Sequence, residues 1–488
     1  MENDLIKAKK MNLQKLRDLN INPYPYKFEI TDYAKAINEE FCDLKNEEKA
    51  KAVSMAGRVM AKRSFGAIAF MKVRDATAEI QFFLRKGDTK QEALDLLSLV
   101  DVGDFVGVKG VVYKTLKGQL SILVDDLEVL SKSILPLPEK FHGLQDIEIR
   151  QRKRYLDLIM NPEVKETFIL RTKIISAWRE FLDSKGFLEV EIPVLQPTYG
   201  GANAQPFITK SNAWKSNFYL SVSPELYLKR LLVGGFDKVY TVCKNFRNED
   251  VDKTHNPEFT MSEFYSAYSD LENIMKLTED MIEFVATKVL GTTQIEYQGV
   301  QINLKAPWKR LKMIDALNAK ANIDAEKMTL EELLELAKKE NVEIDADMKK
   351  KGLVIAELFE HFCESELIQP TFVIDYPKET TPLCKLHRNN SELIERTEAY
   401  INGGEICNGY SELNDPILQR EFFQEQKEQG KAKGEQHPKD DDFLESIGYG
   451  MPPAGGMGLG IDRLVMFLTN SATIRDVILF PQMRPEKK

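Results

Sequence analysis

Residues 246–260 read FRNEDVDKTHNPEFT, and this stretch decides how the middle of the chain folds. The run KVYTVC (238–243) precedes it and the run FTMSEFY (259–265) closes it; both are rich in β-branched and aromatic residues. Two such runs joined by a polar connector predict a β-hairpin with a long loop. Taken alone, such a loop is most often an ordinary charged surface, so its role depends on the rest of the chain.

The second strand of this hairpin presents a candidate ligand-binding face. Side chains alternate along a strand, so Phe259, Met261, Glu263 and Tyr265 share one side. Phe259 and Glu263 are roughly 13 Å apart, which is the reach from a purine ring to the side chain of an amino acid joined to AMP. The ring could stack on a base, the carboxylate could hold a cation, and Arg247 offers a planar fork for phosphate and carboxylate oxygens. Core packing of Phe259 and a solvated strand edge at Glu263 remain open.

A Gly-rich run near the C-terminus, PPAGGMGLGIDR (452–463), predicts turns or close backbone approach. Apolar residues then lead into a helix or a strand, which would deliver Arg463 above the glycines. The run is neither GxGxxG after a strand nor GxxxxGK[ST], which disfavours Rossmann and P-loop nucleotide sites. An exposed Arg463 after a simple turn is the alternative.

The segment EAYINGGEICNGYSE (398–412) predicts two strands joined by a tight turn at Asn402-Gly403-Gly404. Folding back there brings Glu398 towards Glu405. Two close carboxylates repel unless a cation lies between them, and Mg²⁺ takes one or two protein carboxylates together with substrate phosphates. Two unrelated strand-edge glutamates are the alternative. Further along, Asn408, Tyr410 and Glu412 alternate on one face.

A third carboxylate opens a helix in SVSPELYLKRLL (221–232), where Glu225 stands at the N-terminal end. Carboxylates are common there because they compensate the helix dipole, which is the simpler interpretation. The upstream run Gly200-Gly201-Ala202 would let a ligand approach the backbone.

Bulk properties indicate a globular protein of two or three domains. The chain has 488 residues, of which 43% are hydrophobic and 29% charged, with a net charge of −9. No apolar run approaches the eighteen or so residues of a membrane span, and the start MENDLIKAKK is not a secretory signal. The five cysteines are scattered without CxxC, which predicts a reducing cytoplasm and no structural zinc site. The negative net charge leaves nucleic-acid binding to a local basic surface, and residues 57–90 hold eight Lys or Arg against three Asp or Glu.

Periodicity predicts an N-terminal helical extension, a small β-barrel, a linker and a larger α+β domain. About five short strands and one helix within residues 51–133 suit an OB-type Greek-key barrel. In the larger domain, predicted strands are followed by helices and then by strands again, which favours an antiparallel sheet flanked by helices. A helical insertion is expected around 320–370. Late strands are expected at 371–376, 397–413 and 458–468. The expected boundaries are 1–50, 51–133, 134–150 and 151–488.

Together these segments resemble class II aminoacyl-tRNA synthetases. GFLEVEIPVL with Pro193 resembles motif 1, FRNE with HNPEFT resembles motif 2, and GGMGLGIDR resembles motif 3. A class I enzyme is disfavoured because no KMSKS-like segment is present. An OB-like barrel before the catalytic domain is similar to the subgroup that handles lysine, aspartate and asparagine. Dimerisation is implied by the motif 1 resemblance.

The pocket residues favour the lysine-specific members of the class. Aspartate and asparagine members typically carry Gln where SPELYLK has Glu225, and a substrate ammonium favours carboxylates in its pocket. GGANAQPF, SPELYLKRL, FTMSEFYSAY and GYSELNDP also resemble the lysine-specific sequences. One departure is Tyr410, where relatives often have Phe, which puts contacts to the lysine stem in doubt. An Asp- or Asn-specific synthetase and a silent tRNA-binding paralogue are the competing hypotheses.

The resemblance implies roles for individual residues in an enzyme that activates lysine with ATP and transfers it to the 3′ end of tRNA(Lys). Arg247 and Arg463 would be catalytic, and Glu398 and Glu405 would hold Mg²⁺. ATP would be bound by Arg247, Glu249, His255, Asn256, Phe259 and Arg463. Lysine would be bound by Gly201, Glu225, Glu263, Tyr265, Asn408, Tyr410 and Glu412.

The barrel is implied to read the anticodon. Phe70 and Gln81 are expected on adjacent strands, where they resemble the family's base-stacking aromatic and base-reading amide. OB strands bind single-stranded bases by stacking beside a basic groove, to which Arg58 would contribute. For Phe70, a position in the barrel core is the alternative.

Overall fold

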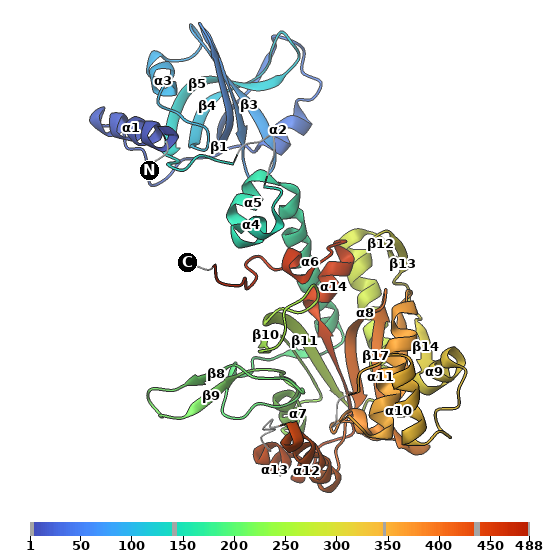
Figure 1. Cartoon of the computed structure of the whole chain (residues 1–488). Helices are drawn as coiled ribbons and strands as arrows, with labels where there is room; N and C mark the ends of the chain where they lie inside the picture. Colours follow the sequence, from blue (N-terminus) through green and yellow to red (C-terminus); the bar gives the residue numbers. More distant parts are fainter. Residues whose placement is uncertain (1–3, 139–143, 345–347, 434–439, 487–488) are drawn as a thin grey trace. The chain divides into compact units, whose positions relative to one another are not determined.

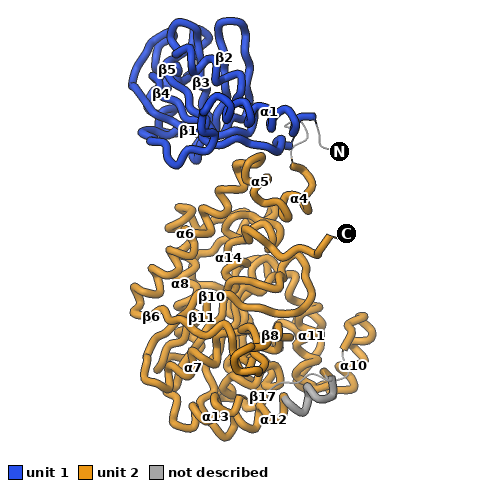
Figure 2. The backbone as a smooth tube through the Cα atoms, turned by 90° about the vertical axis from the view of Figure 1, so that its left-hand side faces the viewer, with its two compact units in different colours: residues 1–143 blue, residues 144–488 orange. Residues whose placement is uncertain are grey.

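The computed structural model describes residues 4–138, 144–344, 348–433 and 440–486. The chain divides into two compact units, residues 1–143 and 144–488, which Figure 2 distinguishes by colour. Among the described residues, no helix combines the length and the apolar character that crossing a membrane requires.

The N-terminal unit contains a closed five-stranded barrel with the strand order β1-β2-β3-β5-β4. A helix, α3 (Gln91–Leu97), lies between β3 and β4 in the chain, so the predicted OB-type arrangement is confirmed. Alternate residues such as Met55, Met71 and Phe82 fill the barrel, as the period of two requires. The strands are β1 (Lys49–Phe65), β2 (Ile68–Arg74), β3 (Glu79–Arg85), β4 (Phe105–Lys114) and β5 (Leu120–Ser131).

The residues before the barrel belong to the same compact unit. They form α1 (Asp4–Asp18) and α2 (Ala34–Glu40). Leu16 of α1 and Ile37 of α2 are fully buried in the apolar cluster that fills the barrel. The extension therefore packs onto the barrel through apolar contacts.

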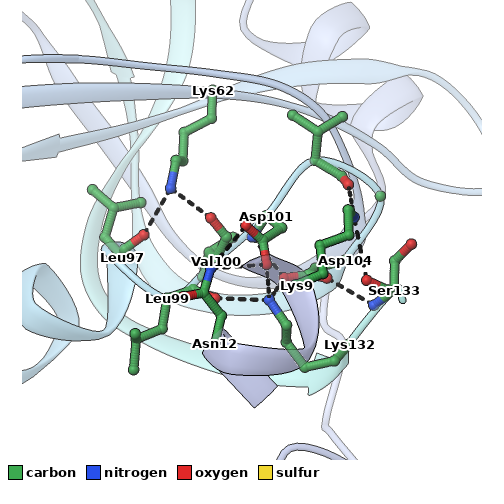
Figure 3. A network of polar contacts seen from close by, with 12 residues as sticks. Lys9, Asn12, Lys62, Leu97, Leu99, Val100, Asp101, Asp104, Lys132 and Ser133 are labelled. Carbon is green, nitrogen blue, oxygen red and sulfur yellow. Dashed lines mark hydrogen bonds and ion pairs between the residues drawn. The ribbon is translucent and has the colours of Figure 1, made fainter. Parts of the chain in front are cut away.

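A buried ionic network fastens the segment between α3 and β4 to the rest of this unit (Figure 3). The ammonium of Lys132 lies 2.6 Å from carboxylate oxygens of both Asp101 and Asp104, and the Lys132 side chain is fully buried. Lys9 of α1 donates to the carbonyl oxygens of Val102 and Ser133. Because buried charges are costly unless they are paired, this network fixes the local backbone where α1 meets the barrel.

The larger unit is built on a sheet with the order β14-β15-β17-β18-β19-β11-β10-β6, to which β16 adds by pairing with β17. The predicted antiparallel sheet is confirmed, although the two edge pairs β14–β15 and β6–β10 are parallel. The strands are β6 (Leu188–Glu189), β10 (Lys238–Phe246), β11 (Glu258–Ala267), β14 (Lys309–Lys312), β15 (Thr371–Pro377), β16 (Leu386–His387), β17 (Asn390–Ile401), β18 (Gly404–Ser411) and β19 (Ala454–Gly460).

One late strand was expected in the wrong place, because the range 458–468 shares only residues 458–460 with the observed strand β19. β19 ends at Gly460, and residues 461–468 form a helix instead of continuing the strand. The backbone leaves the sheet at Gly460, and the apolar residues after it then pack against the sheet from a helix. The turn at Asn402-Gly403 is as predicted, with φ values of 50° and 70° that suit a two-residue hairpin between β17 and β18.

Helices α6, α8 and α14 cover one face of this sheet, and the site lies on the other face, where α7, α9 and α11 pack beside it (Figure 1). Trp178 and Ile174 of α6, together with residues of α8 and α14, pack against Phe264 of β11. The helices of this unit are α4 (Ile147–Arg152), α5 (Arg154–Met160), α6 (Glu163–Ser184), α7 (Glu225–Val233), α8 (Leu271–Leu290), α9 (Met313–Ala321), α10 (Leu330–Lys339), α11 (Lys351–Cys363), α12 (Pro416–Lys433), α13 (Asp441–Gly448), α14 (Ile461–Leu468) and α15 (Ile474–Val477).

Helices α9, α10 and α11 lie in the region around 320–370 where a helical insertion is expected, and they share an apolar cluster of their own. Thr329 caps α10 in a capping box with Glu332. Smaller elements complete the unit: a three-stranded sheet of β7 (Leu195–Gln196), β8 (Ile208–Lys210) and β9 (Asn217–Leu220), a hairpin of β12 (Gln294–Tyr297) and β13 (Val300–Asn303), and 3₁₀ turns at Glu364–Glu366 and Lys378–Thr380.

Candidate active site

A cavity of about 960 Å³ lies on the face of the large sheet opposite α6, α8 and α14. Its walls come from β11, β17, β18, β19, the β10–β11 loop and the start of α7. All the ATP, lysine and metal residues expected in this unit line it, with the exception of Glu412. They are Gly201, Glu225, Arg247, Glu249, His255, Asn256, Phe259, Glu263, Tyr265, Glu398, Glu405, Asn408, Tyr410 and Arg463.

Strand β11 divides its side chains between core and cavity. Ser262 accepts a hydrogen bond of 2.9 Å from Nε1 of Trp178, and Phe264 is fully buried among the helices. Phe259, Glu263 and Tyr265 therefore face the opposite side and line the cavity. The alternation predicted from the sequence holds from Met261 to Tyr265, whereas Thr260 at the start of the strand also lines the cavity.

Arg247 presents an unsatisfied donor to this cavity. Its guanidinium lies 5.2 Å from the centre of the Phe259 ring, and its Nε atom is buried without a hydrogen-bond partner among the described residues. Burial lowers the pKa of Arg247, while nearby Glu249, Glu405 and Glu263 act in the opposite direction. Buried polar groups in proteins are almost always paired, so the orphan donor fits an anionic ligand such as a phosphate.

Contacts across the cavity hold the β10–β11 loop. Nη2 of Arg463 lies 3.1 Å from Nε2 of His255, whose Nδ1 lies 2.8 Å from a carboxylate oxygen of Asp252. Because Arg463 can only donate, Nε2 accepts and Nδ1 carries the proton. Asn256 donates 2.6 Å to Oε1 of Gln482 near the C-terminus, and its own Oδ1 atom is buried without a partner. Asn256 therefore keeps an acceptor free for a ligand.

An ion pair missed by sequence reasoning joins α6 to the two segments that resemble motif 2 and motif 3. Nη1 of Arg171 on α6 lies 2.5 Å from Oδ1 of Asp462, the residue before Arg463. The other carboxylate oxygen of Asp462 accepts from the backbone N–H of Thr260 at 2.6 Å. These two contacts of Asp462 fix the start of α14 and therefore the direction of the Arg463 side chain.

Three glutamates converge at the closed end of the cavity. Glu263 accepts hydrogen bonds of 2.9 Å from both Ser223 and Tyr265. Burial raises the pKa of Glu263 to about 8, with a further contribution from the charge of Glu225. The pKa of Glu412 is likewise raised by burial to about 8, although Lys229 opposes that shift.

A lysine of the chain itself lies between two of these glutamates. Nζ of Lys229 is 2.6 Å from Oε1 of Glu225 and 2.5 Å from Oε2 of Glu412, and the Lys229 side chain is fully buried. Sequence reasoning missed Lys229, although its spacing of four residues from Glu225 on one helix is the spacing of an ion pair. The carboxylate cluster is therefore partly neutralised from within.

Two glycines make room at this end. Gly201 has φ +84°, and a Cβ atom there would lie 2.9 Å from Oγ of Ser223. At Gly456 a Cβ atom would lie 2.3 Å from the Tyr265 ring and 2.5 Å from Oε1 of Glu412. Any side chain at either position would displace groups that line the cavity.

Glu398 and Glu405 face the cavity with different environments. Glu398 is fully engaged, since Tyr376, Tyr400, Arg396 and Asn408 all donate to it. The pKa of Glu405 is raised by burial and by the charge of Glu398. No group of three or more metal-ligating residues occurs among the described residues. Two carboxylates nevertheless fit Mg²⁺, which takes most of its oxygens from phosphate and water.

The barrel of the N-terminal unit carries a separate candidate site on its outer face. Phe70 lies outside the cluster that fills the barrel, and its ring stacks on Phe83 with the centroids 4.9 Å apart. Phe83 in turn lies 6.0 Å from the ring of Tyr113. Gln81, on the strand next to Phe70, donates 2.9 Å to Oγ of Ser121. Phe70 and Gln81 thus share one face with an aromatic platform.

Comparisons with known proteins agree with this architecture. Residues 146–484 match the model of tRNA synthetases class II (D, K and N), and residues 53–130 match that of the OB-fold nucleic acid binding domain. The chain is 49% identical over 490 residues to the lysine–tRNA ligase of Clostridium novyi, covering 99% of this chain and 95% of the relative. It is 50% identical over 486 residues to that of Carboxydothermus hydrogenoformans, covering 99% and 98%.

The chain belongs to the lysine–tRNA ligase family of class II tRNA synthetases. Membership explains why residues from α7, β11, β18 and the β10–β11 loop meet in one cavity. The aromatic platform of Phe70, Phe83 and Tyr113 lies within the residues that match the OB-fold nucleic acid binding domain.

In this lysine–tRNA ligase family member, the third expected anticodon residue lies apart from the other two. Arg58 pairs in register with Arg74 at the far end of β2, and its Nη1 donates 2.9 Å to the carbonyl oxygen of Gly103. Arg63, which sequence reasoning missed, is exposed and directly opposite Phe70. The register of a bulged strand decides this difference, and a bulge cannot be read from the sequence.

Proposed function

We propose that this protein activates lysine with ATP and then transfers the lysyl group to the 3′ end of tRNA(Lys). The observation that carries the proposal is that Glu225 and Glu263 line one cavity with Arg247, whose Nε atom has no partner among the described residues. The buried Glu412 is joined to Glu225 through Lys229. Carboxylates suit the ammonium groups of lysine, and the guanidinium suits the α-phosphate and the substrate carboxylate.

The chemistry needs alignment more than a protein nucleophile. A carboxylate oxygen of lysine attacks the α-phosphorus of ATP, the bond to the bridging oxygen breaks, and diphosphate leaves. No general base is needed because the attacking carboxylate is already ionised. In the second step a terminal hydroxyl of tRNA attacks the carbonyl carbon of the adenylate, its proton is lost, and AMP leaves.

The nucleotide half of the cavity is assigned to residues of the β10–β11 loop and α14. Phe259 stacks on adenine, Glu249 and Asn256 bind its polar edge, and His255 and Arg463 bind the outer phosphates. The acceptor left free on Asn256 and the contact between Arg463 and His255 support this assignment.

The amino-acid half is assigned to the closed end. Glu225 and Glu412 bind the ε-ammonium and Glu263 binds the α-ammonium of lysine, while the aromatic rings flank its stem. The remaining members of this half are Gly201, Tyr265, Asn408 and Tyr410.

Mg²⁺ is the proposed metal, held by Glu405 with Glu398 behind it. When bound, the ion supplies positive charge to the phosphates. The raised pKa of Glu405, which burial and Glu398 cause, supports a carboxylate that gains from a neighbouring cation.

The barrel is the proposed anticodon-binding part, through Phe70, Gln81 and Arg58, and Arg63 is added from the structure. The proposed domains keep the boundaries 1–50, 51–133, 134–150 and 151–488. A homodimer in the cytoplasm is also proposed. Exposed Leu188, Val194 and Leu195 around the segment that resembles motif 1 support an interface, and the absence of disulfides among the five cysteines fits a reducing compartment.

Amino-acid-dependent exchange of diphosphate into ATP tests the proposal. Lysine is expected to support exchange, and aspartate and asparagine are expected to give background rates. Exchange with either of those two amino acids, or with none of the three, contradicts the assignment.

A further inference from the structure

Lys229 has no place in the chemistry above, yet its ammonium lies where the substrate's amine would be recognised. Its Nζ atom bridges Glu225, at the start of α7, and Glu412, directly after β18. Glu225 lines the cavity, and both glutamates are buried. The ion triad therefore spans two elements whose residues are far apart in the sequence.

The charge of Lys229 is retained despite complete burial. Burial alone would lower the pKa of Lys229, but Glu225 and Glu412 raise it instead. An ammonium held in this way neutralises one carboxylate of the cluster. Once their protons have left, Glu225, Glu263 and Glu412 together with Lys229 carry two net negative charges, which equal the two ammonium groups of bound lysine.

We propose that Lys229 is a positioning residue for lysine recognition, which joins Glu225 to Glu412 and adjusts the charge of the pocket to that of the substrate. The inference rests on the proposed function, because it assigns the closed end of the cavity to lysine. Without Lys229 the pocket would hold three unpaired carboxylates, of which at least one would keep a proton.

The groups that act on the triad come from several elements. Other titratable or charged groups that interact electrostatically with Glu412 or Glu225 are Glu263, Tyr265, Cys384, Lys385 and Tyr410. Lys385 acts on Glu412 in the same direction as Lys229, but it is the smaller contributor. Replacement of Lys229 should therefore change the ionisation of Glu412.

The effect on pH dependence has a defined sign. Lys229 lowers the pKa of Glu412 against the effect of burial. In Lys229→Met that pKa rises further, so Glu412 keeps its proton to higher pH and lysine binding requires more alkaline solution. The acid limb, which is the low-pH side of the plot of log(kcat/KM) for lysine against pH, should therefore move to higher pH.

The experiment measures lysine-dependent diphosphate exchange of Lys229→Met from pH 6 to 9, together with thermal unfolding. The acid limb is expected to move upwards by about one pH unit or more. The KM for lysine is expected to rise about tenfold while the KM for ATP changes less than about threefold. If the acid limb of Lys229→Met stays at the pH of the wild type, and any loss of activity is the same at every pH, the proposal is overturned.

Leu232→Ala is the matched control, because Leu232 is a buried apolar residue on the same helix. It is expected to lower the unfolding temperature without moving the acid limb. An equal shift of the limb in this control would assign the effect to helix packing and overturn the role of Lys229.

If Lys229→Met does not fold, the double variant Lys229→Met/Glu412→Gln is compared with Glu412→Gln alone. Removing Glu412 together with Lys229 leaves one buried carboxylate, Glu225, without its cationic partner, where Lys229→Met alone leaves two. The limb is expected to differ by less than about half a pH unit between these two proteins, because Glu412, whose ionisation is proposed to set the limb, is absent from both. A difference of about one unit or more would contradict action through Glu412.

The wild-type protein in the same assay separates the two claims. Failure of lysine to support exchange by the wild type removes the proposed function. If the wild type is active with lysine but the acid limb of Lys229→Met does not move, only the proposed role of Lys229 is contradicted.

Discussion

Nη2 of Arg463 lies 3.1 Å from Nε2 of His255, although 208 positions separate the two residues in the chain. The contact joins the start of α14 to the loop between β10 and β11, and both side chains line the cavity. The proposed nucleotide half of the site is therefore assembled from two segments that only the folded sheet brings together.

Replacement of Arg463 by Lys keeps the charge but removes the planar fork. We expect kcat/KM for ATP in the exchange reaction to fall about 100-fold, because a forked contact to phosphate is lost. Stabilisation of the protein by lysine alone should be unchanged in a thermal shift assay. Arg179→Lys is the control, since Arg179 is a surface residue paired with Glu189; a comparable loss there would remove the specific role of Arg463.

Glu225→Gln preserves the shape of the side chain and removes its charge. Because Glu225 shares Lys229 with Glu412, we expect the KM for lysine to rise about 100-fold, with the KM for ATP within about threefold of the wild type. The exposed Glu272→Gln on α8 serves as the control. Unchanged exchange kinetics with lysine would show that Glu225 does not contact the substrate.

Lysine binding should depend on pH because Glu263 and Glu412 hold protons in the free protein. Burial raises the pKa of each to about 8, with Glu225 adding to the shift of Glu263. These two groups favour the free folded state at low pH, and that contribution is lost as pH rises from their unfolded values towards 8. Bound ammonium groups replace the protons, so the thermal stabilisation by lysine should be larger at pH 8.5 than at pH 6.5.

Calorimetry checks the same linkage independently. Titration of lysine at pH 7 in two buffers of different ionisation enthalpy should reveal net proton release on binding. Identical apparent enthalpies in both buffers, together with a pH-independent thermal shift, would mean that the two carboxyls are already ionised.

Phe70→Ala should separate tRNA recognition from amino-acid activation. Loss of one stacking ring is expected to raise the KM for tRNA in the charging reaction about tenfold. Exchange of diphosphate, which needs no tRNA, should keep its wild-type rate. Phe65→Ala, at an exposed ring on β1, is the control. Loss of both reactions in Phe70→Ala would point to a folding role.

Local sequence patterns predicted the parts of the site that depend on a single element. The period of two along 259–265 identified the cavity face of β11, and the Asn402-Gly403 turn predicted the hairpin of β17 and β18. These signals work because strand alternation and turn chemistry are properties of a few neighbouring residues.

Pairings between distant segments could not be predicted in this way. The partner of Glu412 on α7 and the ion pair between Arg171 and Asp462 depend on where helices dock on the sheet. Likewise, the helix at 461–468 was expected as part of a strand, because a short apolar run after glycines fits either element. Tertiary packing decides such cases.

The central claim is that the glutamates at the closed end recognise a positively charged side chain. Exchange kinetics with lysine and with norleucine, which has the same stem without the ε-ammonium, test it most directly. We predict that kcat/KM for lysine exceeds that for norleucine by about 10⁴-fold, since the buried carboxylates would be left unpaired by norleucine. Similar values for the two amino acids would contradict the account.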